Sequence, residues 1–288
     1  MSIKIDHLTH IYNEGTPFQK VALEDINMSI EKGEFVGIIG HTGSGKSTLI
    51  QMFNGLLKPT KGEVYVNQQN IHGEKINKKE MRQRVGLVFQ YPEYQLFEMT
   101  VKDDVAFGPK NMGLTKEEID KQVKFGLDAV GLDESYYEKS PFELSGGQKR
   151  RVAIAGVLAM NPEILILDEP TAGLDPKGRN ELFEQLKKMH QELGLTIVLI
   201  SHSMEDVAKY VEKLFVLYKG RIAYTGSPRE VFAHGKELEK IGLAMPQIKY
   251  IMEDLKQKGM DVDTDVLTVE EAAAKIIAYL KEKGEQHD

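Results

Sequence analysis

A glycine-rich octapeptide near the start of the chain constrains its fold more than any other feature of the sequence. It lies between an apolar run, Glu34–Ile39, which is typical of a strand, and the stretch Lys46–Asn54, which is typical of a helix. This is the context that the complete phosphate-binding loop (P-loop) pattern requires. A chance glycine turn is the alternative, which the complete motif disfavours. The octapeptide consists of Gly40, His41, Thr42, Gly43, Ser44, Gly45, Lys46 and Ser47.

The residue types of this loop suit the binding of a nucleoside triphosphate. Glycines let successive backbone N–H groups converge on phosphate oxygens, and the positive end of the helix dipole adds attraction. We expect Lys46 to reach the outer phosphates and the hydroxyl of Ser47 to bind Mg²⁺. Thr48 follows directly and is expected at the same site.

A pair of carboxylates later in the chain complements the loop. Asp168 and Glu169 follow the apolar run Ile164–Leu167, which predicts a buried strand. Two ionised carboxylates there are costly without a counter-charge. A bound Mg²⁺ would offset Asp168, which leaves Glu169 to polarise the attacking water. Alone, such a pair is usually a strand meeting its turn, but beside a P-loop the catalytic interpretation is favoured.

Strands alternate with helices along most of the chain, which predicts a mostly parallel sheet. We predict a main domain over residues 1–234, with a helical subdomain at about 91–160, and a C-terminal helical extension over residues 235–288. The extension is expected to hold helices at Ile241–Lys258 and Thr268–Lys283. The other predicted elements are strands at Ile3–Ile5, Gly62–Val66, Leu195–Ser201 and, as a hairpin, Leu214–Tyr218 with Arg221–Tyr224, and helices from the Thr115 capping box, from Arg150 and from the Asp175–Pro176 cap.

Composition narrows the classes of protein to which the chain could belong. Lysine and arginine number 37 against 44 aspartates and glutamates, so the net charge of -7 disfavours a nucleic-acid binder. The absence of cysteine rules out disulfides and thiolate metal sites. No apolar run reaches about 18 residues, and Met1–Tyr12 lacks the order of a secretory signal. We therefore expect any membrane association to come through a partner.

A second short motif identifies a family. Leu144-Ser145-Gly146-Gly147-Gln148 precedes the Asp168-Glu169 strand and matches the signature of ABC-type ATPases. The chain resembles that family, which implies an α/β P-loop ATPase binding ATP and Mg²⁺, with a mostly parallel core sheet, an antiparallel β subdomain, a helical signature subdomain and a small helical C-terminal extension. Ser145 and the backbone amides of Gly146 and Gly147, followed by Gln148, would form a second anion-binding helix start.

The resemblance also assigns roles by position. Gln90 resembles the Q-loop glutamine, which contacts the metal ion and the attacking water, and Asp175 resembles the D-loop aspartate. His202 resembles the switch histidine that acts with Glu169, and Tyr12 resembles the aromatic stacked on adenine. Each has an ordinary alternative, such as a surface amide, a locally satisfied histidine or a strand-end aromatic. In the family, the signature of one subunit closes over the P-loop of another, which implies two sandwiched ATP molecules in a dimer.

The segment after Gln90 narrows the resemblance further. Tyr91-Pro92-Glu93-Tyr94-Gln95-Leu96-Phe97 is similar to the Q-loop segment of energy-coupling factor (ECF) transporter ATPases, which power vitamin and metal-ion uptake. Gly15-Thr16-Pro17-Phe18, the form of the P-loop and the C-terminal extension resemble the second member of the paired ECF ATPases. This implies a heterodimer with a similar ATPase at the cytoplasmic face of a bacterial membrane. A membrane T component would dock near Gln90–Phe97 and connect to substrate-capturing S components.

One residue of this segment carries a sharper hypothesis. Glu93 is acidic and lies just past Gln90, so it would meet a basic residue on a coupling helix of the T component. A solvated loop carboxylate is the alternative. The transported substrate is not predicted, because by resemblance its pocket lies on another polypeptide.

Other kinds of protein compete with this interpretation. The chain could serve another ABC importer or exporter, act as a soluble ABC protein on nucleic acid or ribosomes, or be a binding module without catalysis. A non-catalytic module has no need for Glu169 and His202. Soluble ABC proteins of translation usually join two ATPase domains, and repair ATPases carry coiled-coil or zinc insertions, whereas this sequence shows one ATPase domain and neither insertion.

Overall fold

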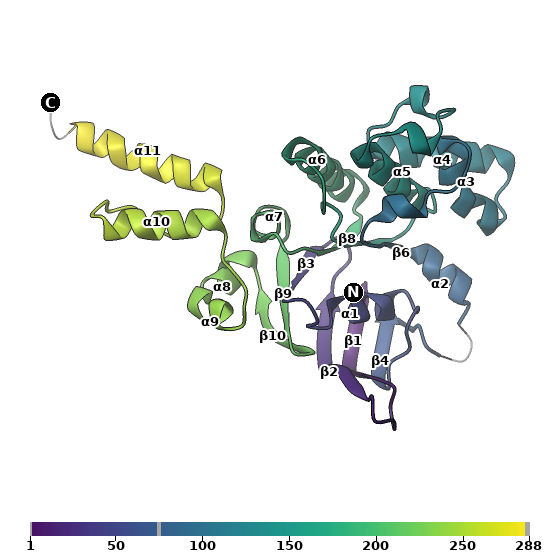
Figure 1. The fold of residues 1–288 in the computed structure, drawn as a ribbon, viewed down its shortest axis with the longest axis horizontal. Coiled ribbons are helices and arrows are strands. Elements are labelled where there is room, and N and C mark those ends of the chain that lie inside the picture. Colours follow the sequence, from purple (N-terminus) through teal and green to yellow (C-terminus); the bar gives the residue numbers. More distant parts are fainter. Residues whose placement is uncertain (1, 74–75, 286–288) are drawn as a thin grey trace.

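The core of the computed structural model, which describes residues 2–73 and 76–285, is a six-stranded sheet (Figure 1). Its strand order is β10-β9-β3-β8-β7-β6, and all neighbours are parallel except the β9–β10 hairpin. Every residue of β3, β7 and β8 is buried, as continuous apolar runs predict for a sheet covered on both faces. The strands are β3 (Phe35–Ile39), β6 (Val85–Val88), β7 (Ile164–Asp168), β8 (Thr196–Ile200), β9 (Lys213–Tyr218) and β10 (Arg221–Gly226).

A four-stranded antiparallel sheet covers one face of this core. Its order is β2-β1-β4-β5, and it packs with helix α1 (Lys46–Phe53) against alternate residues of the parallel strands. Residues of β3 divide between the two faces, with Val36 and Ile38 on this side and Phe35 and Ile39 on the other. The strands are β1 (Ile3–Tyr12), β2 (Lys20–Ile30), β4 (Lys61–Val66) and β5 (Gln69–Asn70).

The opposite face of the core sheet is covered by helices. The Thr115 capping box is confirmed at the start of α4, and a second one at Ser145 starts α5 at Gly146, four residues before the predicted Arg150. Helix α2 was not predicted, although Asn77 caps it with its side chain. Unlike the others, α2 (Lys78–Arg84) packs its buried Met81 into the cluster on the face of the antiparallel sheet. The elements on the helical face are η1 (Pro92–Gln95), α3 (Val101–Met112), α4 (Lys116–Ala129), η2 (Glu134–Tyr136), η3 (Pro141–Glu143), α5 (Gly146–Leu158), α6 (Pro176–Leu193) and α7 (Met204–Tyr210).

The C-terminal helices project on the side away from α3 and α4 (Figure 1). The predicted helix Ile241–Lys258 is too long, because Gly242, with φ 80°, and Pro246 delay its start to Gln247. Helices α10 and α11 enclose a separate apolar cluster around Met252 and Val266, whereas α8 and α9 pack into the main core. The elements are α8 (Pro228–Phe232), α9 (Gly235–Lys240), α10 (Gln247–Gln257) and α11 (Val269–Glu285).

The predicted domain limit between residues 234 and 235 stays a prediction, and the last three residues of the predicted extension lie outside the described part of the chain.

Within residues 2–73 and 76–285, no helix combines the length and the apolar character that crossing a membrane requires.

Candidate nucleotide-binding site

The P-loop connects β3 to α1 in the predicted strand–loop–helix order. Gly45 caps α1 with φ 110° and no side-chain hydrogen bond, so the first N–H groups of the helix keep their capacity to bind an anion. Glycine is required here, since a Cβ on Gly45 would lie 2.8 Å from the carbonyl oxygen of Ala22. Gly40 is equally constrained, because a Cβ would lie 2.3 Å from the carbonyl oxygen of Leu217.

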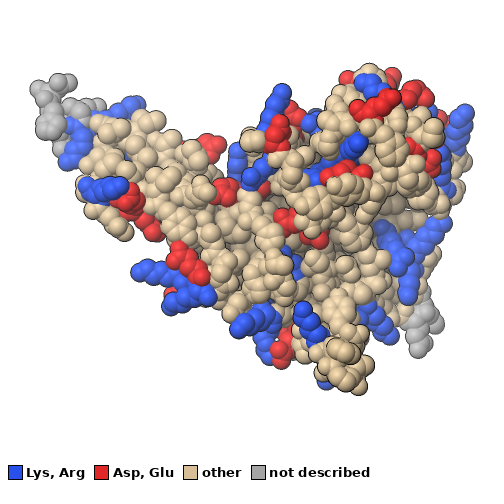
Figure 2. Space-filling model, in the orientation of Figure 1, with Lys and Arg blue, Asp and Glu red and all other residues tan. Residues whose placement is uncertain are grey.

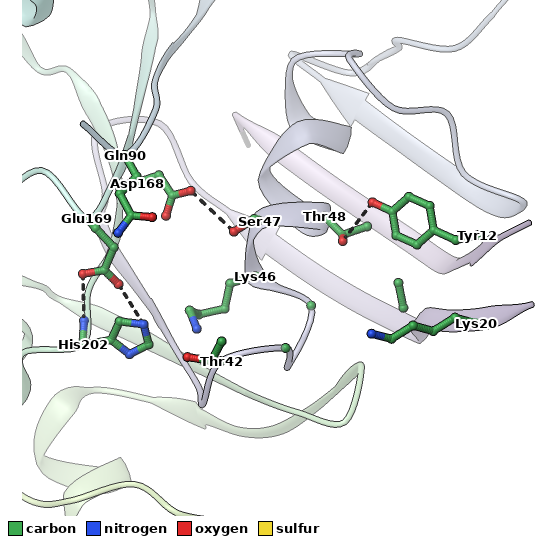
Figure 3. A pocket seen from close by; sticks show the side chains of 13 residues that line it. Tyr12, Lys20, Thr42, Lys46, Ser47, Thr48, Gln90, Asp168, Glu169 and His202 are labelled. Atoms are coloured by element: carbon green, nitrogen blue, oxygen red, sulfur yellow. Dashed lines mark hydrogen bonds and ion pairs between the residues drawn. The ribbon is translucent and has the colours of Figure 1, made fainter. Parts of the chain in front are cut away.

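Lys46 holds the loop together from inside. Its ammonium donates to the carbonyl oxygens of Gly40 at 2.6 Å and His41 at 3.2 Å. The side chain is buried, and burial lowers the pKa of Lys46 while the carboxylates of Glu169 and Asp168 act in the opposite direction. The positive charge is thus fixed among the residues that line the cleft, where phosphates would bind (Figure 3).

The two residues after the lysine face different parts of the cleft. Ser47 Oγ lies 3.5 Å from Asp168 Oδ2, at the upper limit of a hydrogen bond. Thr48 Oγ1 lies 3.2 Å from the hydroxyl of Tyr12. Burial raises the pKa of Asp168, and Lys46 partly offsets this. A buried carboxylate beside a hydroxyl is an oxygen donor set that fits Mg²⁺.

Glu169, the residue after β7, has a backbone conformation that few residues with side chains adopt. Its φ is 49°, and its carboxylate is held against the loop after β8, where Oε2 accepts from the backbone N–H of His202 at 3.3 Å. Oε1 lies 3.3 Å from His202 Nε2, within ion-pair distance, but makes no hydrogen bond in the described chain. Burial raises the pKa of Glu169 to about 7 and lowers the pKa of His202.

A cleft of about 390 Å³ brings most of the predicted residues together (Figure 3). Lys20 and Ala22 also line it and were not predicted. The register between β1 and β2 places Lys20 directly opposite Tyr12, so strand pairing, rather than any local motif, puts it there. The lining residues are Tyr12, Lys20, Ala22, Thr42, Gly43, Gly45, Lys46, Ser47, Thr48, Gln90, Asp168, Glu169 and His202.

The other predicted P-loop residues support the loop from behind. Ser44 is buried and His41 packs edge-on against Tyr218, with ring centroids 5.5 Å apart. Neither these two residues nor Gly40 lines the cleft. They shape the backbone that would hold the phosphates.

The signature and D-loop residues lie elsewhere in the fold. Ser145 and Gln148 cap α5 reciprocally, and Gln148 Nε2 donates to the hydroxyl of Tyr136 at 3.1 Å. Asp175 caps α6 by accepting from the N–H of Gly178 at 2.7 Å. The cleft includes none of the predicted set Ser145, Gly146, Gly147, Gln148 and Asp175. A single chain therefore does not assemble all the predicted nucleotide contacts.

The hypothesis that Glu93 reaches outward to a partner is wrong. Its carboxylate is held within the chain by Arg150, with Oε1 at 2.7 Å from Nη2 and Oε2 at 3.1 Å from Nε. The basic partner comes from α5, 57 positions along the chain. A buried arginine needs such a counter-charge, and Glu93 supplies it.

Comparison with known proteins decides the family. The family model described as ABC transporter matches residues 23–172, more than half of the chain. The chain belongs to the ABC transporter family. Among ABC proteins, it is 56% identical to the energy-coupling factor transporter ATP-binding protein EcfA2 of Caldanaerobacter subterraneus subsp. tengcongensis, over 98% of both chains. It is also 56% identical to the protein of that name from Clostridioides difficile, over 99% of both chains.

Solved ABC structures have the same fold. CbiO1 of Clostridium perfringens, described as part of the ABC transporter complex CbiONQ, superposes with a TM-score of 0.75 at 44% identity, covering 87% of this chain and 98% of its own. The ATP-binding cassette MJ0796, solved as a dimer in a post-hydrolysis state with ADP and Pi, gives a TM-score of 0.68 at 32% identity, covering 78% and 98%. This ABC protein is an ATPase of the ECF type, as predicted, while the roles of its individual site residues stay predictions.

Proposed function

We propose that this ATPase pairs with a second, similar ECF ATPase and energises an importer at the cytoplasmic face of a bacterial membrane. A membrane T component would dock beside Gln90–Phe97, and S components joined through the complex would capture vitamins or other micronutrients. The observation that carries the proposal is an open apolar groove at this segment, separate from the nucleotide cleft. The names of the two relatives, both ATP-binding proteins of ECF transporters, support it.

The groove has a volume of about 550 Å³ and lies between η1, α2, α3 and α5. Gly108 and Gly156 line it, and so do two exposed aromatic rings, those of Phe97 and Phe107. Such a groove suits the apolar face of an amphipathic helix. Lys79 and Arg82 form a basic rim on α2, where Figure 2 shows clustered blue side chains, so the docked helix would carry acidic residues at that edge. Its apolar lining includes Leu96, Phe97, Phe107, Met112, Val157 and Met160.

In the nucleotide cleft, each predicted residue has a task that its position supports. Tyr12 would stack on the base and Lys46 would bind the outer phosphates. Ser47, Gln90 and Asp168 would hold Mg²⁺, which neutralises phosphate charge when bound. Glu169 Oε1 has an unused acceptor position from which it would take a proton of the attacking water, with the His202 ring beside it.

A partner subunit would complete the site. Among the residues that the structure describes, a Cβ on Gly146 would meet no atom within 4 Å beyond its own helix backbone, and its φ is not one that favours glycine, so no contact in this part of the chain explains a glycine there. Close approach of a phosphate to the start of α5 does explain it. The signature would therefore face the P-loop of the second ATPase, and ATP binding would close the dimer.

The test is purification of the tagged chain from detergent-solubilised native membranes, with mass spectrometry of its partners. Co-purification of a second ATPase, a multi-helix T component and S components is the expected result. Phe107→Glu in the groove should release the membrane proteins and keep nucleotide binding, because it places a charge on the apolar lining. The control is Leu193→Glu on α6, a side chain of similar exposure outside the groove (46% for Phe107, 52% for Leu193).

Other results would change the assignment. A different permease would leave only the general ABC transporter function. If no membrane protein co-purifies, a soluble ABC function acting on nucleic acid or ribosomes would replace the proposal.

A further inference from the structure

Arg150 is a charged side chain in the interior of the protein. It lies on α5, five residues after the signature serine, and is only 2% exposed. A buried charge is stable only when it is paired and its hydrogen-bonding groups are satisfied. The nucleotide cleft and the groove do not include this residue, so neither site described above explains it.

All three guanidinium nitrogens make hydrogen bonds, and they contact two separate segments, η1 and the turn after Glu169. Nε and Nη2 make a bidentate pair with Glu93, at 3.1 and 2.7 Å. Nη1 donates to the carbonyl oxygens of Pro170 at 3.0 Å and Ala172 at 2.5 Å. The planar fork of arginine suits this double task, which a lysine cannot reproduce.

The two carbonyls belong to the turn that follows Glu169. Ala172 closes this turn by donating its N–H to the carbonyl oxygen of Glu169 at 3.2 Å. Glu169 has φ 49°, and a non-glycine residue in this region persists only where its surroundings hold it. Arg150 provides part of this restraint, because it donates hydrogen bonds to the carbonyl oxygens of Pro170, which follows Glu169, and of Ala172, which closes the turn.

The other end of the contact lies in the segment that lines the groove. Glu93 is in η1, three residues after Gln90, and Tyr91 at the start of this short helix also has a positive φ of 55°. The far end of the segment is held by Asp104, whose Oδ2 accepts the N–H groups of Phe97 and Glu98 at 3.0 and 2.9 Å. Segment 91–97 is therefore held by Arg150 through Glu93 and by Asp104 at its far end. Arg150 also contacts the turn 170–172 that follows Glu169.

We propose that Arg150, paired with Glu93, is a positioning residue for ATP hydrolysis, which fixes the turn 170–172 so that the Glu169 carboxylate stays at the cleft. Hydrolysis then depends on the position of segment 91–97. The positioning of Glu169 rests on the ATPase activity and on the role proposed above for Glu169 in hydrolysis. Control by a membrane partner at the groove rests on the proposed function.

The test uses variants of the full-length chain that keep side-chain size. Glu93→Gln removes the charge of one partner, and Arg150→Lys keeps the charge but loses the fork. Each should lower kcat for ATP hydrolysis by about 10- to 100-fold, the effect of a small displacement of a reacting group. The dissociation constant for ATP should stay within about twofold, because the P-loop cradle is untouched. The matched control is Glu98→Gln, which changes the same charge close by and should keep wild-type kcat.

The double variant separates a shared role from two independent ones. If the pair acts as a unit, Glu93→Gln with Arg150→Lys should be no slower than the slower single variant. Unchanged kcat in Glu93→Gln, or additive losses in the double variant, would overturn the proposal. Parallel loss of ATP binding, kcat and thermal stability would also overturn it, because it would show a role in folding only. A wild-type chain without membrane partners would refute the proposed function and leave this test intact.

Discussion

Replacing Glu169 with glutamine should slow ATP hydrolysis strongly and stabilise the folded protein. The isosteric amide can still accept the backbone N–H of His202, and the P-loop is unchanged, so nucleotide binding should persist. Loss of a general base typically lowers the rate by about 10²- to 10⁴-fold, and we expect kcat to fall within that range. ATP hydrolysis under single-turnover conditions, together with equilibrium nucleotide binding, measures both quantities.

The stability change follows from the position of the carboxylate. Its side chain is 13% exposed, and burial raises the pKa of Glu169 from 4.5 to about 7. Each pKa unit corresponds to 1.36 kcal/mol, so the ionised carboxylate costs the folded state roughly 3 kcal/mol. Because the folded pKa is the higher one, the free energy of unfolding falls as the pH rises from about 4.5 to about 7, and the full cost applies above that range.

Urea unfolding without nucleotide or divalent cations therefore gives a direct comparison. At pH 8, the Glu169→Gln variant should be more stable than the wild type by up to about 3 kcal/mol, and this difference should shrink toward pH 5. Glu237→Gln, at an exposed position on α9, is the control and should be neutral at both pH values. Hydrolysis within tenfold of the wild type, or equal stability at pH 8, would refute the reasoning.

Two further predictions concern the antiparallel sheet. Tyr12→Ala should weaken ATP binding by roughly 5- to 100-fold, because stacking on a base contributes about 1–3 kcal/mol. In Tyr12→Phe, which loses only the contact with Thr48, the dissociation constant for ATP should stay within about threefold of the wild type. Equal losses of affinity in the two variants, measured by calorimetric titration, would argue against stacking. Burial lowers the pKa of His10 below 6.5, so the free energy of unfolding should fall as the pH drops below 6.5, by at most about 1.4 kcal/mol per pH unit for this group. His10→Phe should reduce that slope in denaturation measured from pH 7 to 5, and an unchanged slope would show that the imidazole is not responsible.

Motifs whose geometry depends only on residues close to them in the sequence could be predicted from the sequence. The P-loop needs glycines, a preceding strand and a following helix, all within Glu34–Phe53, and the structure places them as predicted. The Asp168–Glu169 pair likewise follows from a single buried strand. The helix start at Thr115 depends on capping residues three positions apart, and so does the start at Ser145, although that helix was predicted only from Arg150. Local geometry determines each of these features.

Features that depend on pairing between distant segments could not be predicted. Lys20 joins the cleft because of strand register with Tyr12. Glu93 pairs with Arg150 through the packing of η1 against α5, which redirects a carboxylate that the sequence alone suggested was available to a partner. Such contacts depend on the relative placement of whole elements, and no periodicity in the sequence encodes that placement.

The sequence by itself determined the family of this protein and the residues predicted to carry its chemistry, because the phosphate loop and the Asp168–Glu169 pair each consist of a few consecutive residues. Only the tertiary structure decided which of these groups meet within one chain. It brings Lys46, Asp168 and Glu169 to one cleft because β3 and β7 run in parallel on either side of β8 and end at the same edge of the sheet. It leaves the signature at Ser145 outside the cleft, because that motif starts a helix in the layer above the sheet.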